Sequence, residues 1–241
     1  MFRYKLKKHD FHLWLVDVND TEVLLETLSS FLSNEELHKA EKFKFEKDRK
    51  VSIISRGVLR LLLSKYLNTN PSNIKFIYGQ YGKPIVTNKE NITFNVSHSS
   101  NKIIIGFTKG YDIGVDVELI KYNFDLVNIA ENFFSKSEIN LLSKFQPKDY
   151  PIGFYRCWTR KESFIKAKSK GLSFPLDSFS VSLDSDSNAE ITETKWNNNE
   201  RHEWFVHSLN LGKTYQVAAA IRGKITNIET IEFSKFNKYF L

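Results

Sequence analysis

Two carboxylates stand two residues apart in the run Gly114-Val115-Asp116-Val117-Glu118. A β-strand points alternate side chains to opposite faces, so Asp116 and Glu118 share one face and the valines share the other. Neighbouring carboxylates repel unless a cation lies between them, and Mg²⁺ is usually held by one or two carboxylates together with substrate phosphates. The alternative is an ordinary amphipathic strand with a solvated acidic face, which alternation alone favours.

A second group lies in Trp158-Thr159-Arg160-Lys161-Glu162-Ser163-Phe164-Ile165-Lys166. Glu162 and Lys166 are four residues apart in the order acid then base, so on a helix they share a face, where they could form a simple surface ion pair. In the functional interpretation, Glu162 is a third carboxylate or a general base, and Lys166 is a cation for a phosphate. Trp158 lies one turn before Glu162, so this face is not uniformly solvated, which favours the functional interpretation.

A third candidate is the stretch Asn95-Val96-Ser97-His98-Ser99, at the end of an expected strand. Its hydroxyl and imidazole groups could donate hydrogen bonds to an anion, although a lone histidine is more often structural. The sequence has no G-x-S-x-G elbow, so a Ser/His/Asp hydrolase is weakly supported. Neither a Walker loop nor G-x-G-x-x-G occurs, and the six His and single Cys show no zinc-ligand spacing.

A basic stretch, Lys39–Lys50, holds six Lys or Arg and three Asp or Glu. It is either a solvated helical face or an anion-binding surface. The interleaved Phe43 and Phe45 could stack on nucleic-acid bases, although side chains of this kind more often turn into a core.

These residues must be positioned by a mixture of helices and short strands. Alternating or apolar runs predict strands, and Ser33 and Ser135, each with a Glu three residues later, predict helix starts with capping boxes. Long helices are expected to end near Asn68 and near Lys170. The polar stretches Asp184–Asn188 and Trp196–Glu200 are expected to be surface loops. The strands are predicted at Phe11–Val18, Ile92–Val96, Lys102–Phe107, Ile113–Leu119, Ser178–Leu183, Glu203–Leu209, Tyr215–Arg222 and Thr226–Phe233.

Composition limits the classes of protein. The chain has 241 residues, 41% hydrophobic and 26% charged, which suits a globular protein and excludes a disordered one. Its net charge of +7 is spread evenly, so an anionic small molecule, an acidic protein and nucleic acid all remain possible partners. Cys157 is the only cysteine, so no intrachain disulfide can form. We find no signal peptide and no long apolar run, and we expect a cytoplasmic protein.

Taken together and in this order, the motifs resemble the 4′-phosphopantetheinyl transferase family. The family's two diagnostic motifs, G-[VI]-D-[VIL]-E and W-[ST]-x-K-E-[SA]-x-x-K, correspond to residues 114–118 and 158–166. Its Y-G-K-P and N-x-S-H-S features correspond to Tyr81–Pro84 and Asn95–Ser99, and Gly171–Val181 is also similar. The resemblance is strongest to the surfactin-synthetase-activating bacterial type. It implies an α+β fold of two similar lobes, residues 1–110 and 111–241, related by pseudo-two-fold symmetry in a monomer.

The resemblance also implies a reaction and its residues. Coenzyme A would donate its phosphopantetheine arm to a serine of an acyl or peptidyl carrier protein, releasing 3′,5′-ADP and activating non-ribosomal peptide, polyketide or fatty-acid synthases, for example in antibiotic biosynthesis. Asp116, Glu118 and Glu162 would hold Mg²⁺, Glu162 would also act as base, and Lys166 would stabilise the charge on the phosphate. The implied coenzyme A contacts are Lys39, Arg49, Lys50, Lys83, Pro84, Ser97, His98 and Lys161.

This chain departs from the family in the region of the 3′-phosphate. Glu36 stands near a position where the family often has Lys, and Val51 stands where the family has a basic residue. We expect Lys39, Arg49 or Lys50 to compensate. The alternatives are a basic nucleic-acid-binding module, a Mg²⁺-dependent phosphohydrolase and a degenerate family member that only binds; the intact Asp116, Glu118, Glu162 and Lys166 oppose the last of these.

Overall fold

The computed structural model describes residues 4–235, which form two compact units. Unit 1 comprises residues 4–78, 84–110 and 227–235, and unit 2 comprises residues 79–83 and 111–226. The chain therefore mixes helices with small, mostly antiparallel sheets, and the predicted α+β class is confirmed. The pseudo-two-fold relation between the units stays a prediction.

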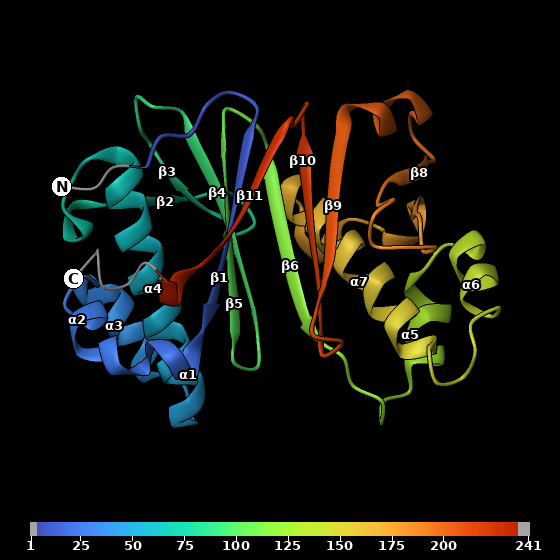
Figure 1. The fold of residues 1–241 in the computed structure, drawn as a ribbon, viewed down its shortest axis with the longest axis horizontal. Coiled ribbons are helices and arrows are strands. Elements are labelled where there is room, and N and C mark those ends of the chain that lie inside the picture. The colour runs from blue at the N-terminus through green and yellow to red at the C-terminus, as the bar shows by residue number, and fades with distance from the viewer. Residues whose placement is uncertain (1–3, 236–241) are drawn as a thin grey trace. The chain divides into compact units, whose positions relative to one another are not determined.

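Unit 1 is built on a four-stranded sheet in the order β11-β1-β5-β4. Strand β11 pairs parallel with β1, and the other pairs are antiparallel. The helices lie on one side of this sheet (Figure 1). The strands are β1 (Asp10–Asp17), β2 (Phe76–Tyr78), β3 (Pro84–Val86), β4 (Ile92–Ser99), β5 (Lys102–Lys109) and β11 (Asn227–Glu232), and the helices are α1 (Val18–Thr21), α2 (Leu25–Ser29), α3 (Asn34–Glu41) and α4 (Glu46–Leu67).

The long helix α4 buries its apolar face against the sheet. Ile54, Val58 and Leu62 are fully buried in one cluster with side chains of β1, β4 and β5. The helix ends as predicted at Asn68, which adopts the left-handed conformation (φ 51°) favoured after a helix. The predicted capping box at Ser33 is confirmed, because the Ser33 hydroxyl accepts from the Glu36 amide and the Glu36 carboxylate accepts from the Ser33 amide.

Unit 2 packs a long helix, α7, against a three-stranded antiparallel sheet in the order β6-β10-β9. Helices α5, α6 and α7 lie on the same side of this sheet (Figure 1). Its core combines side chains from all three helices with those of β7 and β9. The helices are α5 (Leu126–Phe133), α6 (Lys136–Leu142) and α7 (Tyr150–Ala167), and the strands are β6 (Ile113–Leu119), β7 (Phe179–Val181), β8 (Ile191–Thr194), β9 (Trp204–Leu211) and β10 (Tyr215–Arg222).

The division of the chain differs from the expected one at its C-terminal end. Residues 227–235, expected in the second lobe, belong to unit 1, where β11 pairs with β1 from Asp10–Asn227 to Leu15–Glu232. No local sequence pattern predicts that two strands so far apart in the chain pair with each other. Within residues 4–235, no helix combines the length and apolar character needed to cross a bilayer.

Candidate active site

Strand β6 and helix α7 make a backbone contact at Gly114. A Cβ atom placed on Gly114 would lie 2.0 Å from the carbonyl oxygen of Ser163 and 2.4 Å from the backbone nitrogen of Ala167. Both are rigid helix backbone atoms, so only glycine allows this approach. Gly114 therefore sets the separation between the strand and the helix that carry the two predicted motifs, and we call this contact the Gly114 joint.

The joint brings the two motifs together. Gly114, Asp116 and Glu118 follow the two-residue period of β6 and share the face turned toward α7. Lys166 Nζ lies 2.5 Å from Asp116 Oδ1, an ion pair in which the Asp116 side chain is 5% exposed. Glu162 lies one turn before Lys166 on the same helix face. The carboxylates and the lysine that the sequence singles out thus form one cluster within unit 2, which we call the acidic cluster.

Burial and like charge act on Glu162. Desolvation, followed by the nearby Asp116 carboxylate, raises the pKa of Glu162 to about 7. Its Oε1 atom is buried and has no hydrogen-bond partner among the described residues. Burial opposes the charge on Lys166, but the carboxylates of Asp116, Glu162 and Glu118 together outweigh it, so the pKa of Lys166 is raised. Glu162 is thus a carboxyl group that changes charge near neutral pH beside a lysine that stays protonated.

The cluster is not a closed metal cage. No group of three or more His, Cys, Asp or Glu within residues 4–235 meets closely enough to hold a metal ion by itself. The ammonium of Lys166 lies against Asp116, which balances part of the negative charge. The donors nevertheless suit a hard cation, because they are carboxylate oxygens and one of them, Glu162 Oε1, is buried and unpartnered.

Lys161 lies outside the acidic cluster, on another face of α7. Its side chain is fully buried, and Nζ lies 2.9 Å from Glu138 Oε2. It also donates to the carbonyl oxygens of Leu176 (2.8 Å) and Phe179 (2.6 Å). Glu138 in turn completes the predicted capping box of α6 and accepts from the Val181 amide. All three ammonium protons are thereby engaged, so Lys161 joins α7 to α6 and β7 and has no proton left for a phosphate.

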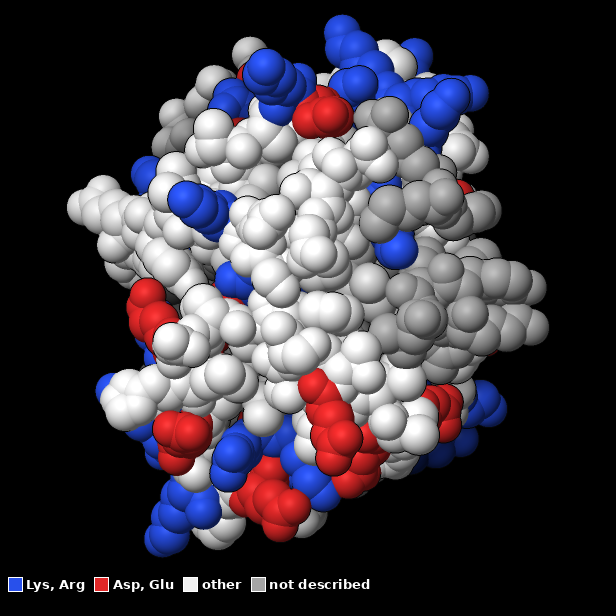
Figure 2. Space-filling view, turned by 90° about the vertical axis from the view of Figure 1, so that its left-hand side faces the viewer, with Lys and Arg blue, Asp and Glu red and all other residues white. Residues whose placement is uncertain are grey.

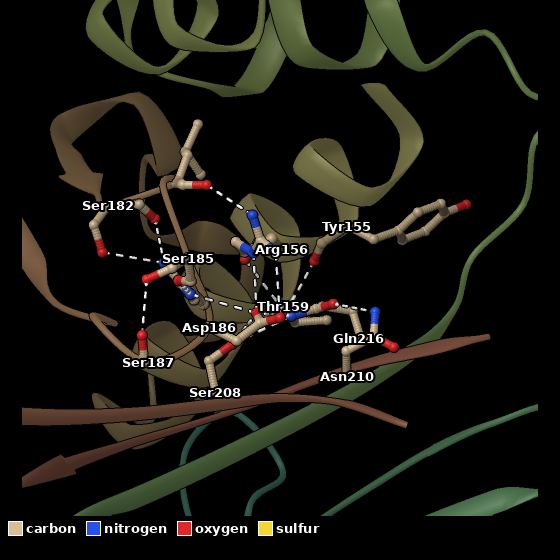
Figure 3. Close-up of polar contacts among 12 residues, drawn as sticks. Tyr155, Arg156, Thr159, Ser182, Ser185, Asp186, Ser187, Ser208, Asn210 and Gln216 are labelled. Carbon is tan, nitrogen blue, oxygen red and sulfur yellow. Dashed lines mark hydrogen bonds and ion pairs between the residues drawn. The ribbon is translucent and has the colours of Figure 1, made fainter. Parts of the chain in front are cut away.

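The predicted surface loop Asp184–Asn188 contains a second anchor of α7 (Figure 3). Asp186 Oδ1 accepts from Arg156 Nε at 2.9 Å and from Gln216 Nε2, on β10, at 2.5 Å. Although burial opposes its ionisation, the hydrogen bond from Arg156 lowers the pKa of Asp186. Arg160, fully buried, donates to the carbonyl oxygens of Ser182 and Ser185. The stretch is a surface loop as expected, with Asp184, Ser187 and Asn188 exposed, but through Asp186 it also joins α7 to the sheet.

The other predicted surface loop, Trp196–Glu200, also contributes a buried charge. Glu200 is 8% exposed and pairs with Lys168, just after the end of α7. Trp196 Nε1 donates to the same carboxylate at 2.6 Å. Each of the two surface loops therefore contributes one carboxylate that binds a basic residue of α7 or of the segment just after it.

Unit 1 has a cavity of about 360 Å³ between α4 and the end of β4. Of the predicted coenzyme A contacts, Pro84 and His98 line it. Ser97 is buried on β4 and is not part of the lining. The remaining lining residues are Phe43, Lys47, Asp48, Val51, Ser52, Ser55, Arg56, Leu59, Val96 and Ser100.

The basic residues expected at an anion site lie elsewhere. Lys39 pairs with Glu35 at 2.9 Å and is 55% exposed, and Lys50 pairs with Glu22 at 2.6 Å. Arg49, on α4, does not line the cavity. Lys83 donates to backbone carbonyl oxygens of unit 2. The predicted cations therefore do not gather at the cavity.

Arg56 and Lys47 are the lining cations that sequence reasoning missed. Arg56 Nε lies 3.5 Å from Glu36 Oε1, and the guanidinium lies 4.6 Å from the centre of the Phe76 ring. Its Nη1 is buried without a hydrogen-bond partner in the described part of the chain. Lys47 and Arg56 are nine residues, or two and a half turns, apart on α4, so helical periodicity alone does not place them on one face. Both nevertheless line the cavity, which the sequence pattern could not predict.

Positive charge does not form a continuous band on the helical side of unit 1. Lys and Arg gather at the upper edge in Figure 2, whereas they are interleaved with Asp and Glu at the lower edge. Within the Lys39–Lys50 stretch, Lys39 and Lys50 are already paired with carboxylates. This pattern does not support a nucleic-acid-binding module, which needs clustered free cations.

Comparisons with known proteins identify the family to which the chain is similar. The family model described as "4'-phosphopantetheinyl transferase superfamily" matches residues 112–220, and the one described as "4'-phosphopantetheinyl transferase, N-terminal" matches residues 19–108. The chain is 40% identical over 167 residues to 4'-phosphopantetheinyl transferase ffp of Bacillus subtilis, covering 68% of this chain and 72% of that protein. It is 34% identical over 170 residues to 4'-phosphopantetheinyl transferase HetI of Nostoc sp., covering 69% and 72%.

The joint yields a stability prediction. Gly114→Ala places a methyl group against helix backbone, so we expect the free energy of unfolding to fall by about 3 kcal/mol, at the upper end of overpacking costs. Urea denaturation measures it. Gly212→Ala is the control, because Gly212 has a φ of 64° but no atom within 4 Å of an added Cβ; backbone strain alone costs about 1 kcal/mol. Equal losses in the two variants would contradict the close contact.

The acidic cluster yields a pH prediction. Between pH 4.5 and about 7 the folded chain holds the Glu162 proton more tightly than the unfolded chain, so its contribution to stability falls as pH rises. Glutamine stays neutral. We therefore expect Glu162→Gln to be more stable than wild type at pH 8 by about 3 kcal/mol, and the difference to shrink toward pH 4.5.

Urea denaturation at pH 5 and pH 8, with EDTA present, measures this difference. Glu26→Gln, at an exposed position on α2, controls for the amide itself. A Glu162→Gln effect of the same size at both pH values would show that Glu162 titrates normally in the folded state.

Proposed function

Because the chain belongs to the 4′-phosphopantetheinyl transferase superfamily, we propose how its own residues perform that family's reaction. The enzyme transfers the 4′-phosphopantetheine arm of coenzyme A to a serine hydroxyl of a carrier protein and releases 3′,5′-ADP. The observation that carries the assignment of residues is the acidic cluster, where both family motifs meet at the Gly114 joint.

The reaction needs a base for the serine hydroxyl and positive charge for the pyrophosphate. Glu162 is proposed as the base, because a pKa of about 7 lets its carboxylate accept a proton efficiently at neutral pH. The serine oxygen then attacks the phosphorus that carries the pantetheine, and the bond from that phosphorus to the oxygen of the nucleotide phosphate breaks. Lys166, protonated beside Asp116, donates to the phosphate oxygens as charge develops on the leaving group.

Asp116, Glu118 and Glu162 are proposed to hold Mg²⁺. Two features support this: the carboxylates are close enough to raise the pKa of Glu162, and Glu162 Oε1 is buried without a partner. Mg²⁺ commonly takes one or two carboxylates and fills its other positions with water and substrate phosphate, so a closed protein cage is not required. When bound, the ion neutralises pyrophosphate charge.

The unit 1 cavity is proposed to receive the nucleotide end of coenzyme A, with Arg56 in place of the expected Lys39, Arg49 or Lys50 as the contact of the 3′-phosphate. Glu36 accepts from Arg60 Nε and lies 2.8 Å from its Nη2, so Arg60 alone balances the Glu36 charge. Arg56, a second guanidinium on the same carboxylate, therefore remains as excess positive charge with a buried, unpartnered N–H. Lys47 and His98 are further donors to the same cavity.

The acceptor is proposed to be an acyl or peptidyl carrier domain, and the chain is proposed to act as a cytoplasmic monomer. Neither the phosphohydrolase nor the nucleic-acid alternative gains support from the relatives, which are named transferases.

The first experiment is intact-protein mass spectrometry of an unmodified peptidyl carrier domain incubated with the enzyme, coenzyme A and Mg²⁺. We expect the carrier to gain one phosphopantetheine unit, and the gain to disappear with EDTA. Glu162→Gln should reduce the rate at least a hundredfold, because base catalysis is worth about 10²–10⁴-fold. Hydrolysis of coenzyme A without transfer would instead indicate a phosphohydrolase, and undiminished transfer in EDTA would exclude the metal proposal.

The assignment of Arg56 is tested by donor preference. The ratio of kcat/KM for coenzyme A to that for dephospho-coenzyme A, which lacks the 3′-phosphate, should fall at least about tenfold in Arg56→Gln, the value of one charged hydrogen bond. Lys39→Gln, at an exposed lysine paired with Glu35, is the matched control and should keep the wild-type ratio. A fall confined to Lys39→Gln would restore the original expectation.

A further inference from the structure

Lys83 connects the strand and the helix that form the Gly114 joint. Its Nζ donates to the carbonyl oxygen of Ile113, at the start of β6, at 2.7 Å. The same atom donates to the carbonyl oxygen of Lys166, near the end of α7, at 2.9 Å. One residue therefore bonds to both backbones, next to Gly114 on the strand and at the catalytic lysine on the helix.

The turn that carries Lys83 is itself held in place. The Gly79 amide donates to the Lys83 carbonyl oxygen at 3.0 Å, and the Gly82 amide donates to the Gly79 carbonyl oxygen at 2.9 Å. Gly82 has a φ of 79°, which a residue other than glycine adopts only with strain. Residues 79–83 also group with unit 2 rather than with the flanking residues of unit 1. The turn thus presents the Lys83 side chain to unit 2 from a fixed backbone.

We propose that Lys83 is a positioning residue: it fixes β6 against α7 at the Gly114 joint and so holds Asp116 and Lys166 in register for transfer. This inference rests on the proposed function. The resemblance instead implies that Lys83 lines a nucleotide pocket. The two roles differ in the hydrogen-bond acceptor. In the positioning role the ammonium donates to backbone carbonyl oxygens, and in the ligand role it donates to a phosphate or to the nucleotide base.

The surroundings of Lys83 favour the positioning role. Lys83 is partly buried, and desolvation lowers its pKa to about 8. The charge of Asp112 opposes this shift without cancelling it. Within residues 4–235 no ion pair accompanies Lys83, and its two hydrogen bonds to backbone carbonyl oxygens offset the cost of desolvating the ammonium.

The kinetic test compares Lys83→Met, which keeps length and removes the donors, with Lys83→Arg, which restores donors. Lys89→Met, at an exposed lysine in the turn before β4, is the control. Under the proposal, Lys83→Met lowers kcat at least about tenfold at saturating coenzyme A, because a small displacement of reacting groups costs up to about a hundredfold. The KM for coenzyme A should change less than threefold, and Lys83→Arg should recover part of kcat.

Binding and exchange measurements separate this inference from the proposed function. Calorimetry with 3′,5′-ADP should give affinities within threefold in wild type and Lys83→Met. Hydrogen–deuterium exchange of peptides covering 113–119 and 163–170 should be faster in Lys83→Met but not in Lys89→Met, whether or not a carrier is modified. A tenfold loss of 3′,5′-ADP affinity with unchanged kcat and unchanged exchange would overturn the inference and make Lys83 a ligand contact. Absence of transfer by the wild type would overturn the proposed function alone, and exchange would still decide whether Lys83 fixes the joint.

Discussion

The contact between β6 and α7 at Gly114 is the constraint on which the acidic cluster depends. A strand and a helix normally stand apart by the thickness of their side chains, but here a missing Cβ lets the backbones touch. Two residues along the strand, Asp116 then lies within 2.5 Å of Lys166, which a wider separation would prevent. Gly114 of the strand motif and Lys166 of the helix motif are therefore linked, because the ion pair of Lys166 needs the close approach that Gly114 allows.

That closeness has an electrostatic cost. Glu162 is half-buried beside Asp116 and Glu118, and its raised pKa shows that the folded chain disfavours its charge. The cost is offset elsewhere on α7. Lys161 is bonded to Glu138 in the core, and Arg156 and Arg160 are tied to the 182–186 segment (Figure 3). These contacts hold the helix from faces other than the one that carries Glu162 and Lys166.

The sequence predicts which chemical groups lie on the same face of one strand or one helix. It does not predict which of these faces meets a cavity, a loop or the core. A period of two joins Asp116 to Glu118, a spacing of four joins Glu162 to Lys166, and both capping boxes form as predicted. Lys161 is adjacent to Glu162, but helical geometry turns it the other way, into the core. Asp186 lies in a surface stretch, as its polar composition suggests, but no sequence pattern predicts that its carboxylate binds Arg156 and Gln216. Arg56 faces a cavity that only the packing of α4 on the sheet creates.

The net charge of +7 is therefore a poor guide to where anions bind. Exposed cations such as Lys39 and Lys50 are neutralised by neighbours on their own surface, and such pairs contribute little. The better candidates for binding a phosphate are partly buried cations that lie beside a shared carboxylate. Arg56 shares Glu36 with Arg60, while Lys166 lies at Asp116, itself one member of a group of carboxylates. In a low-dielectric setting, the excess positive charge of Arg56 would attract an anion more strongly than a solvated lysine does, whereas the carboxylates of Asp116, Glu118 and Glu162 outnumber the charge of Lys166. The placement of counter-charges is therefore a better guide to candidate anion sites than the number of basic residues.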